Sequence, residues 1–133
     1  MSAVETAARE FLRGIDERDI AAVTAVIAPD FRFLRPVRRG DREVDRQYIA
    51  GRDRFLDFLG RRFTVRPSDH QVEVWAETGL RGLAEGRIVY PDEGVVVGFL
   101  FSARVNADGE LDYVNTTLYP LVPADAPSMA VDT

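Results

Sequence analysis

The chain of 133 residues contains no cysteine and no lysine, and it has a single histidine, His70. Without cysteine it cannot form disulfides, thiolate metal sites or thiol nucleophiles. Without lysine it cannot form a Schiff base or supply the lysine of a phosphate-binding loop. One imidazole cannot provide the paired histidines of catalytic zinc sites. These absences favour chemistry without a metal or cofactor, and we expect neither.

Long apolar runs and an excess of positive charge are also missing. The longest apolar run, 94–102, is far shorter than the ~20 residues that cross a membrane, and the start of the chain lacks a signal-peptide pattern. We therefore expect a cytoplasmic protein with no membrane partner. Arginines cluster between residues 32 and 66, but the net charge is −5. Charge runs are usually solvated faces, so we expect no nucleic-acid partner.

Apolar residues are plentiful: 46% of the chain is hydrophobic, with 8 Phe, 4 Tyr and 1 Trp. This is enough to bury one core at this length. We expect a single domain over 1–122. The tail 123–133 is rich in Pro, Ala and Asp and is expected to be frayed.

Spacing and capping residues predict three helices in the first half of the chain. The capping box Ser2-x-x-Glu5 begins a first helix that should end near residue 17. Asp19 can cap a second, shorter helix. A third helix should follow Gly51.

Alternating apolar residues predict about six strands. The first should begin at Phe31, after Pro29 ends the second helix, and it should carry Arg35 on the same face as its phenylalanines. A short strand should end near Ala50. The later strands are expected over 70–77, 80–90, 95–105 and 111–121. In the first of these, alternation places His70 and Val74 on one face and Trp75 on the other, outward face.

The order of these elements, together with the segments 8–19, 27–33, 51–58 and 106–111, resembles the NTF2-like superfamily. That superfamily includes SnoaL-like polyketide cyclases, ketosteroid isomerases and limonene-type epoxide hydrolases. The resemblance implies an α+β, cone-shaped barrel in which three helices pack in a curved, mixed or antiparallel sheet. It also implies an apolar cavity between helices and sheet, and a homodimer.

The catalytic groups of those enzymes are not matched. The resemblance places the isomerase tyrosine at Phe11, the proton-shuttling aspartate at Arg35 and the second acid at Phe101. The acid of the SnoaL-like cyclases falls near Thr116, and the epoxide hydrolase Arg-x-Asp pair falls on 81–83, which reads Arg-Gly-Leu. The activity must therefore come from other residues, or the protein does not catalyse a reaction.

Two residues remain as candidate catalytic groups, His70 and Arg35. Histidine titrates near neutrality without help, so His70 could act as a general base if it reaches the cavity, but a histidine at a strand entry is often exposed. A guanidinium beside phenylalanines is costly to bury unpaired. Arg35 should therefore bind a carboxylate or stabilise an enolate, or else form an ion pair with Asp41, Glu43 or Asp45.

The remaining predicted ligand contacts form the wall of the cavity. They are Phe11, Phe33, Tyr48, Phe55, Tyr90, Phe101, Thr116 and Leu118. Such a wall is apolar with a few polar groups, which is usual for small-molecule sites. The same side chains could simply fill a core.

Two functions follow from these observations. The first is proton-transfer chemistry of the isomerase, cyclase or hydratase type on a polyketide-like or terpenoid-like compound that carries an oxygen or anionic group. The second is a binding or scaffold protein without catalysis. In either case we expect a homodimer that pairs through the outer face of the sheet, because Trp75, Tyr113 and Tyr119 are predicted to point outward.

Overall fold

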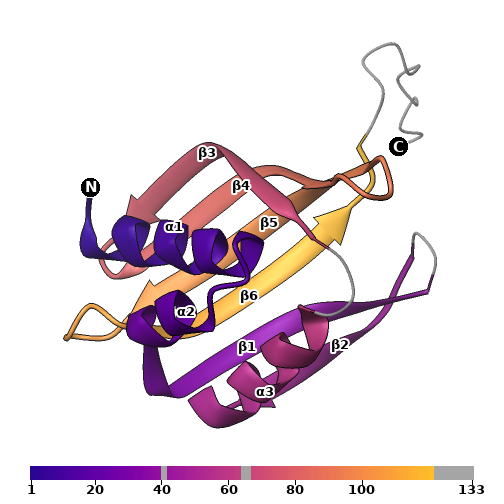
Figure 1. The fold of residues 1–133 in the computed structure, drawn as a ribbon. Helices are drawn as coiled ribbons and strands as arrows, with labels where there is room; N and C mark the ends of the chain where they lie inside the picture. The colour runs from indigo at the N-terminus through magenta and orange to yellow at the C-terminus, as the bar shows by residue number, and fades with distance from the viewer. Residues whose placement is uncertain (40–41, 64–66, 122–133) are drawn as a thin grey trace.

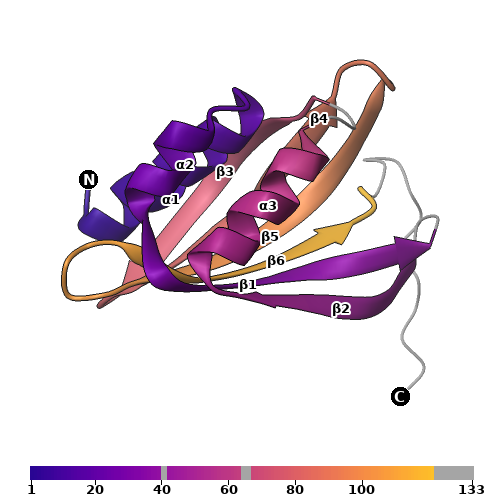
Figure 2. The same cartoon turned by 60° about the horizontal axis from the view of Figure 1, so that its bottom comes forward.

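Six strands form one curved sheet, and three helices lie on its concave side in the computed structural model (Figures 1 and 2). The structure describes residues 1–39, 42–63 and 67–121. Its elements are α1 (Ala3–Asp16), α2 (Ile20–Val26), β1 (Ile27–Arg39), β2 (Arg42–Ala50), α3 (Arg52–Arg62), β3 (Asp69–Thr78), β4 (Arg81–Tyr90), β5 (Val95–Val105) and β6 (Leu111–Tyr119). The predicted tail 123–133 lies outside the described residues.

The strand order is β2-β1-β6-β5-β4-β3. Strands β1 and β6 run parallel, and the other neighbours are antiparallel. The predicted α+β architecture with a six-stranded mixed sheet is therefore confirmed. Within the described part of the chain, no helix is long and apolar enough to span a membrane.

Helix α1 forms as its capping box predicts. The Ser2 hydroxyl accepts a hydrogen bond from the Glu5 backbone N–H at 3.1 Å, and the apolar stripe of the helix is buried against the sheet. At its other end Gly14 lies against α2, where an added Cβ would come within 2.7 Å of Val23. A small residue is therefore needed where the two helices meet.

Strand β1 begins four residues earlier than predicted. It starts at Ile27 and includes Pro29, so the proline does not separate helix from strand. The pairing with β6 is irregular here, with a register shift between Ile27 and Arg32. A proline has no N–H to donate, so it is tolerated at such an irregularity.

The prediction for Trp75 is wrong because β3 contains a β-bulge. The register with β4 shifts between Val72 and Val74, so the alternation of faces reverses after the shift. Val74 is exposed, and Trp75 instead packs against the core. A Cβ added to Gly82 would overlap the indole ring. One of the three aromatic residues expected on the outer face is therefore on the inner face.

Candidate functional site

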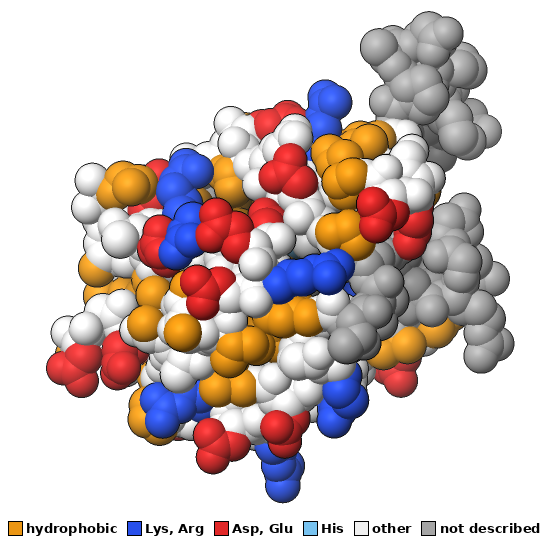
Figure 3. Space-filling model, viewed as in Figure 1, with side chains coloured by type: hydrophobic (Ala, Val, Ile, Leu, Met, Phe, Trp, Pro, Cys, Tyr) orange, Lys and Arg blue, Asp and Glu red, His pale blue; other side chains and the backbone are white. Residues whose placement is uncertain are grey.

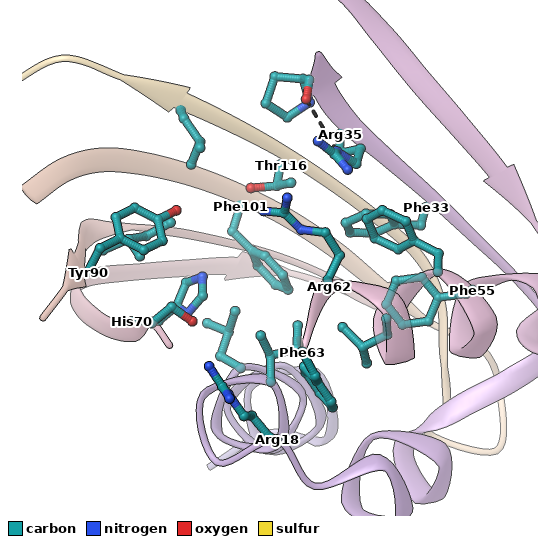
Figure 4. Close-up of a pocket in the computed structure, with 18 residues that line it drawn as sticks. Arg18, Phe33, Arg35, Phe55, Arg62, Phe63, His70, Tyr90, Phe101 and Thr116 are labelled. Carbon is teal, nitrogen blue, oxygen red and sulfur yellow. Dashed lines mark hydrogen bonds between the residues drawn. The ribbon is translucent and has the colours of Figure 1, made fainter. Parts of the chain in front are cut away.

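A cavity of about 330 Å³ lies between the helices and the inner face of the sheet (Figure 4). Its wall is largely apolar and aromatic, with three arginines and a few other polar side chains. The lining residues are Leu12, Ile15, Arg18, Phe33, Arg35, Pro36, Phe55, Phe58, Leu59, Arg62, Phe63, Ser68, His70, Ile88, Tyr90, Phe101, Thr116 and Leu118. Such a lining fits a small organic molecule with a few polar groups.

Strand alternation explains why many of these side chains lie on the cavity wall. Residues two apart in a strand share a face, so Phe33 and Arg35 of β1 both reach the cavity, as do Thr116 and Leu118 of β6. The predicted residues that line the cavity are His70, Arg35, Phe33, Phe55, Tyr90, Phe101, Thr116 and Leu118. Strand alternation and, for Phe55, helical spacing indicated which residues share a face, and the family resemblance implied that this face lines the cavity.

Two predicted ligand contacts lie elsewhere. Phe11 is only 1% exposed and packs behind the wall, with its ring 5.7 Å from that of Phe55. Tyr48 is 56% exposed. It pairs with Leu34, on the face of the sheet opposite Phe33, and so points away from the cavity. We correct the predicted site by removing both residues.

Asp16, which the predicted site did not include, forms hydrogen bonds with His70. The His70 Nδ1 lies 2.6 Å from Asp16 Oδ1, and the His70 backbone N–H donates to Oδ2 at 2.7 Å. The Ser68 hydroxyl also donates to Oδ1, at 3.0 Å. Asp16 follows the lining residue Leu12 by one helical turn, which places both on one face of α1. That spacing, within the segment 8–19 that carries the family resemblance, was the sequence signal for its position.

These contacts determine the tautomer of His70. An ionised carboxylate can only accept hydrogen bonds, so Nδ1 carries the proton in its bond to Asp16. In the neutral form of the ring, the other nitrogen, Nε2, then carries the lone pair. The imidazole also packs edge-on against Phe99, with ring centroids 5.4 Å apart. The ring is therefore held in one orientation at the cavity wall.

Arg35 lies at another part of the wall. Its guanidinium stacks over the Phe58 ring at 5.0 Å, and its Nε–H donates to the Pro36 carbonyl at 3.3 Å. Burial lowers the pKa of Arg35, and the positive charge of Arg62 lowers it further. Of the ion-pair partners predicted for Arg35, Asp41 and the Glu43 side chain lie outside the described residues.

Arg62 and Arg18 add positive charge that the predicted site did not include. Arg62 belongs to the last turn of α3, and Arg18 follows α1 with a positive φ of 58°. Among the described residues, no acidic side chain lines the cavity. On the helix side of the molecule, by contrast, arginine and acidic side chains are interspersed (Figure 3). The charged side chains that line the cavity directly are thus arginines, whereas both signs of charge occur on the surface.

Within the described ranges there is no group of three or more His, Asp or Glu side chains that could hold a metal ion. The polar groups that the cavity offers are the histidine with its aspartate, the arginines and the hydroxyls. This set can move a proton and attract an anion.

Comparison with known proteins gives a consistent picture of the fold. A model of the SnoaL-like domain matches residues 8–114. The comparison with curated proteins gave no match. Many solved structures are similar. One is a candidate ketosteroid isomerase from Kribbella flavida, with 16% identity, 98% of this chain and 91% of that chain covered, and a TM-score of 0.69.

Two further structures have the same fold. A candidate SnoaL-like polyketide cyclase from Shewanella denitrificans is 13% identical, with 89% of this chain and 91% of that chain covered and a TM-score of 0.69. TerC, co-crystallized with polyporic acid, is 20% identical, with 87% of this chain and 91% of that chain covered and a TM-score of 0.72.

Proposed function

Because the chain belongs to the SnoaL-like domain family, we propose that it is a proton-transfer enzyme in which His70 is the general base. Solved structures of the same fold include a candidate isomerase, two candidate polyketide cyclases and an epoxide hydrolase. The observation that carries the proposal is the hydrogen-bonded pair of Asp16 and His70 at the cavity wall.

The proposed step is removal of a proton from a carbon next to a carbonyl group. The lone pair of His70 Nε2 takes the proton, the C–H bond breaks, and its electrons move to the carbonyl oxygen to form an enolate. Asp16 accepts the Nδ1–H bond and stabilises the imidazolium that results. In an isomerisation, the proton returns to a different carbon of the compound. In a cyclisation, the enolate carbon instead bonds to a second carbonyl carbon of the same compound, the C=O π electrons move to that oxygen, and the oxygen takes the proton from His70. Neither outcome changes the net composition.

The proposed substrate is an apolar compound with oxygen substituents, of the polyketide or terpenoid kind. The aromatic wall formed by Phe33, Phe55 and Phe101 supports a ring-containing body. TerC has the same fold and was crystallized with polyporic acid, which supports an organic acid as a ligand for a cavity of this shape.

A binding protein without catalysis is the second candidate. It is favoured by Thr116, which provides a hydroxyl where the resemblance to SnoaL-like cyclases placed an acid. The two functions differ in whether His70 exchanges a proton with the bound compound, and this difference can be measured.

The test is deuterium exchange into enolisable ring ketones, such as 2-tetralone, followed by mass spectrometry in D₂O. Wild type should accelerate exchange, and His70→Gln should lower the rate by about 100-fold or more, the usual contribution of a positioned base. Asp16→Asn should also lower it, because the tautomer of His70 is then no longer held. Asp57→Asn changes an exposed carboxylate of α3 and should have no effect. Equal exchange by wild type and His70→Gln would overturn the proposal.

A further inference from the structure

We propose that Arg35 and Arg62 together form a carboxylate-binding site in the cavity, and that its ligand is a compact aromatic carboxylate. This inference rests on the function proposed above, because it concerns the same cavity and names the chemical class of the compound held there.

The two guanidinium groups reach the cavity from different elements. Arg35 comes from β1 and Arg62 from the last turn of α3. Figure 4 shows both side chains directed toward the part of the cavity near Thr116, while His70 and Tyr90 lie across from them. The charge of Arg62 contributes to the lowered pKa of Arg35, so the two cations are close enough to repel each other.

The acidic side chains in the described part of the chain, Asp16 beside His70 included, form no ion pair with either arginine. Several arginines outside the cavity do have acidic partners: Arg9 with Glu5, Arg13 with Glu10, Arg87 with Glu73, and Arg104 with Asp112. Arg35 and Arg62 have no such ion pair within the described residues. Burying like charges together is unfavourable unless an anion joins them. The structure therefore assigns the missing negative charge to the ligand.

The geometry of Arg35 favours a carboxylate. Its Nε–H is already donated to the Pro36 carbonyl, and Phe58 supports one face of its guanidinium. The terminal N–H groups remain for a ligand, and a guanidinium fork matches the two oxygens of a carboxylate. Lysine could not make this paired contact, and the chain contains none.

The rest of the cavity wall determines which apolar group can accompany the carboxylate of the ligand. Rings of Phe33, Phe55 and Phe101 line the cavity and favour a flat, aromatic compound. A volume of about 330 Å³ lies at the lower end of the range for small-molecule sites. A single or fused pair of rings bearing one carboxylate fits these conditions.

The experiment compares 2-naphthoate with its neutral amide, 2-naphthamide, by isothermal titration calorimetry at neutral pH. Wild type should bind naphthoate about tenfold or more tightly than the amide, the difference expected for charge-assisted hydrogen bonds. Arg35→Met and Arg62→Met keep most of the apolar stem. Each should weaken naphthoate binding by about tenfold or more and leave amide binding nearly unchanged.

Arg54→Met is the matched control, because Arg54 lies on the same helix as Arg62, is exposed and does not line the cavity. It removes the same charge and should not change either affinity. His70→Gln should also retain naphthoate binding, so loss of catalysis and loss of the anion site are distinguishable.

Three outcomes would overturn the inference. They are equal affinity of wild type for the acid and the amide, no detectable naphthoate binding at millimolar concentrations, and an equal loss of naphthoate affinity in Arg54→Met. Circular dichroism on each variant ensures that the compared proteins are folded.

Discussion

Single side chains in this protein acquire their chemistry from partners distant in sequence. His70 is bonded to Asp16, which lies 54 residues earlier in the chain. Glu77 at the end of β3 accepts hydrogen bonds from the Trp75 indole N–H and the Ser2 hydroxyl, each at 2.8 Å. Asp16 and His70 are the groups that act in the proposed proton-transfer reaction. The hydrogen bonds of Glu77 instead link the start of α1 to the sheet.

The Glu77 contacts predict a pH-dependent contribution to stability. The hydrogen bonds from Trp75 and Ser2 hold the pKa of Glu77 below its usual value of 4.5. A lowered pKa in the folded state stabilises the protein above the unfolded pKa, and this contribution is lost as pH falls through the folded pKa.

Urea denaturation should therefore show wild type to be more stable than Glu77→Gln at about pH 6, with a smaller difference below about pH 4. Asp92→Asn, in an exposed turn, serves as the control and should show no such convergence. A difference that stays constant with pH would contradict the expected role of the Glu77 charge.

At the scale of elements, a glycine in β4 allows this strand to lie close to β3. An added Cβ at Gly86 would overlap the backbone carbonyl of Gln71 in β3, next to the bulge. Backbone atoms cannot move aside as a flexible side chain can. The bulge thus turns Trp75 inward, and the absence of a side chain at Gly86 leaves room for the backbone of β3 beside the bulge.

Substitutions of two glycines should have opposite effects on stability. Gly86→Ala should lower the free energy of unfolding by about 1–3 kcal/mol, the usual cost of overpacking. Gly60 lies in α3 with no atom within 4 Å of an added Cβ. Gly60→Ala should raise the free energy of unfolding by about 0.5–1 kcal/mol, because alanine loses less backbone entropy in a helix. Thermal and urea unfolding measure both, and a Gly86→Ala variant as stable as wild type would contradict the close approach.

At the scale of the whole molecule, the two faces of the sheet differ. The inner face holds the core and the cavity, while the outer face exposes apolar side chains, including Val74, Leu83 and Leu100 at 56%, 58% and 47%. The registers place these residues on neighbouring strands, since Leu100 and Val74 both pair with Glu85. Adjacent exposed apolar groups of this kind often mark a protein interface.

We propose that the outer face pairs two copies of the chain. Sedimentation at micromolar concentration should give about twice the 14.9 kDa of one chain. Leu83→Asp and Leu100→Asp should each yield monomers. Val44→Asp, on the edge strand β2 and also exposed, should leave the dimer intact. A monomeric wild type would contradict this proposal, which no longer depends on Trp75.

The sequence by itself indicated the helices and strands, and its resemblance to a known family implied the fold class and most of the cavity wall. Helix caps and residue spacing act within a few residues, and strand alternation places Phe33 with Arg35 without knowledge of the rest of the chain. These features are local, so they can be derived from the sequence. Pro29 shows the limit, because its place inside β1 depends on an irregular pairing with β6.

Only the tertiary structure decided the orientation of Trp75, the bond between Asp16 and His70, and the meeting of Arg35 with Arg62. A bulge in β3 reverses the alternation after Val72, and no single-strand pattern contains that shift. Asp16 and His70, like Arg35 and Arg62, come from different elements of the chain, and they come near each other when sheet and helices pack. Local periodicity assigns each side chain to a face, but packing between elements determines which partner it meets there.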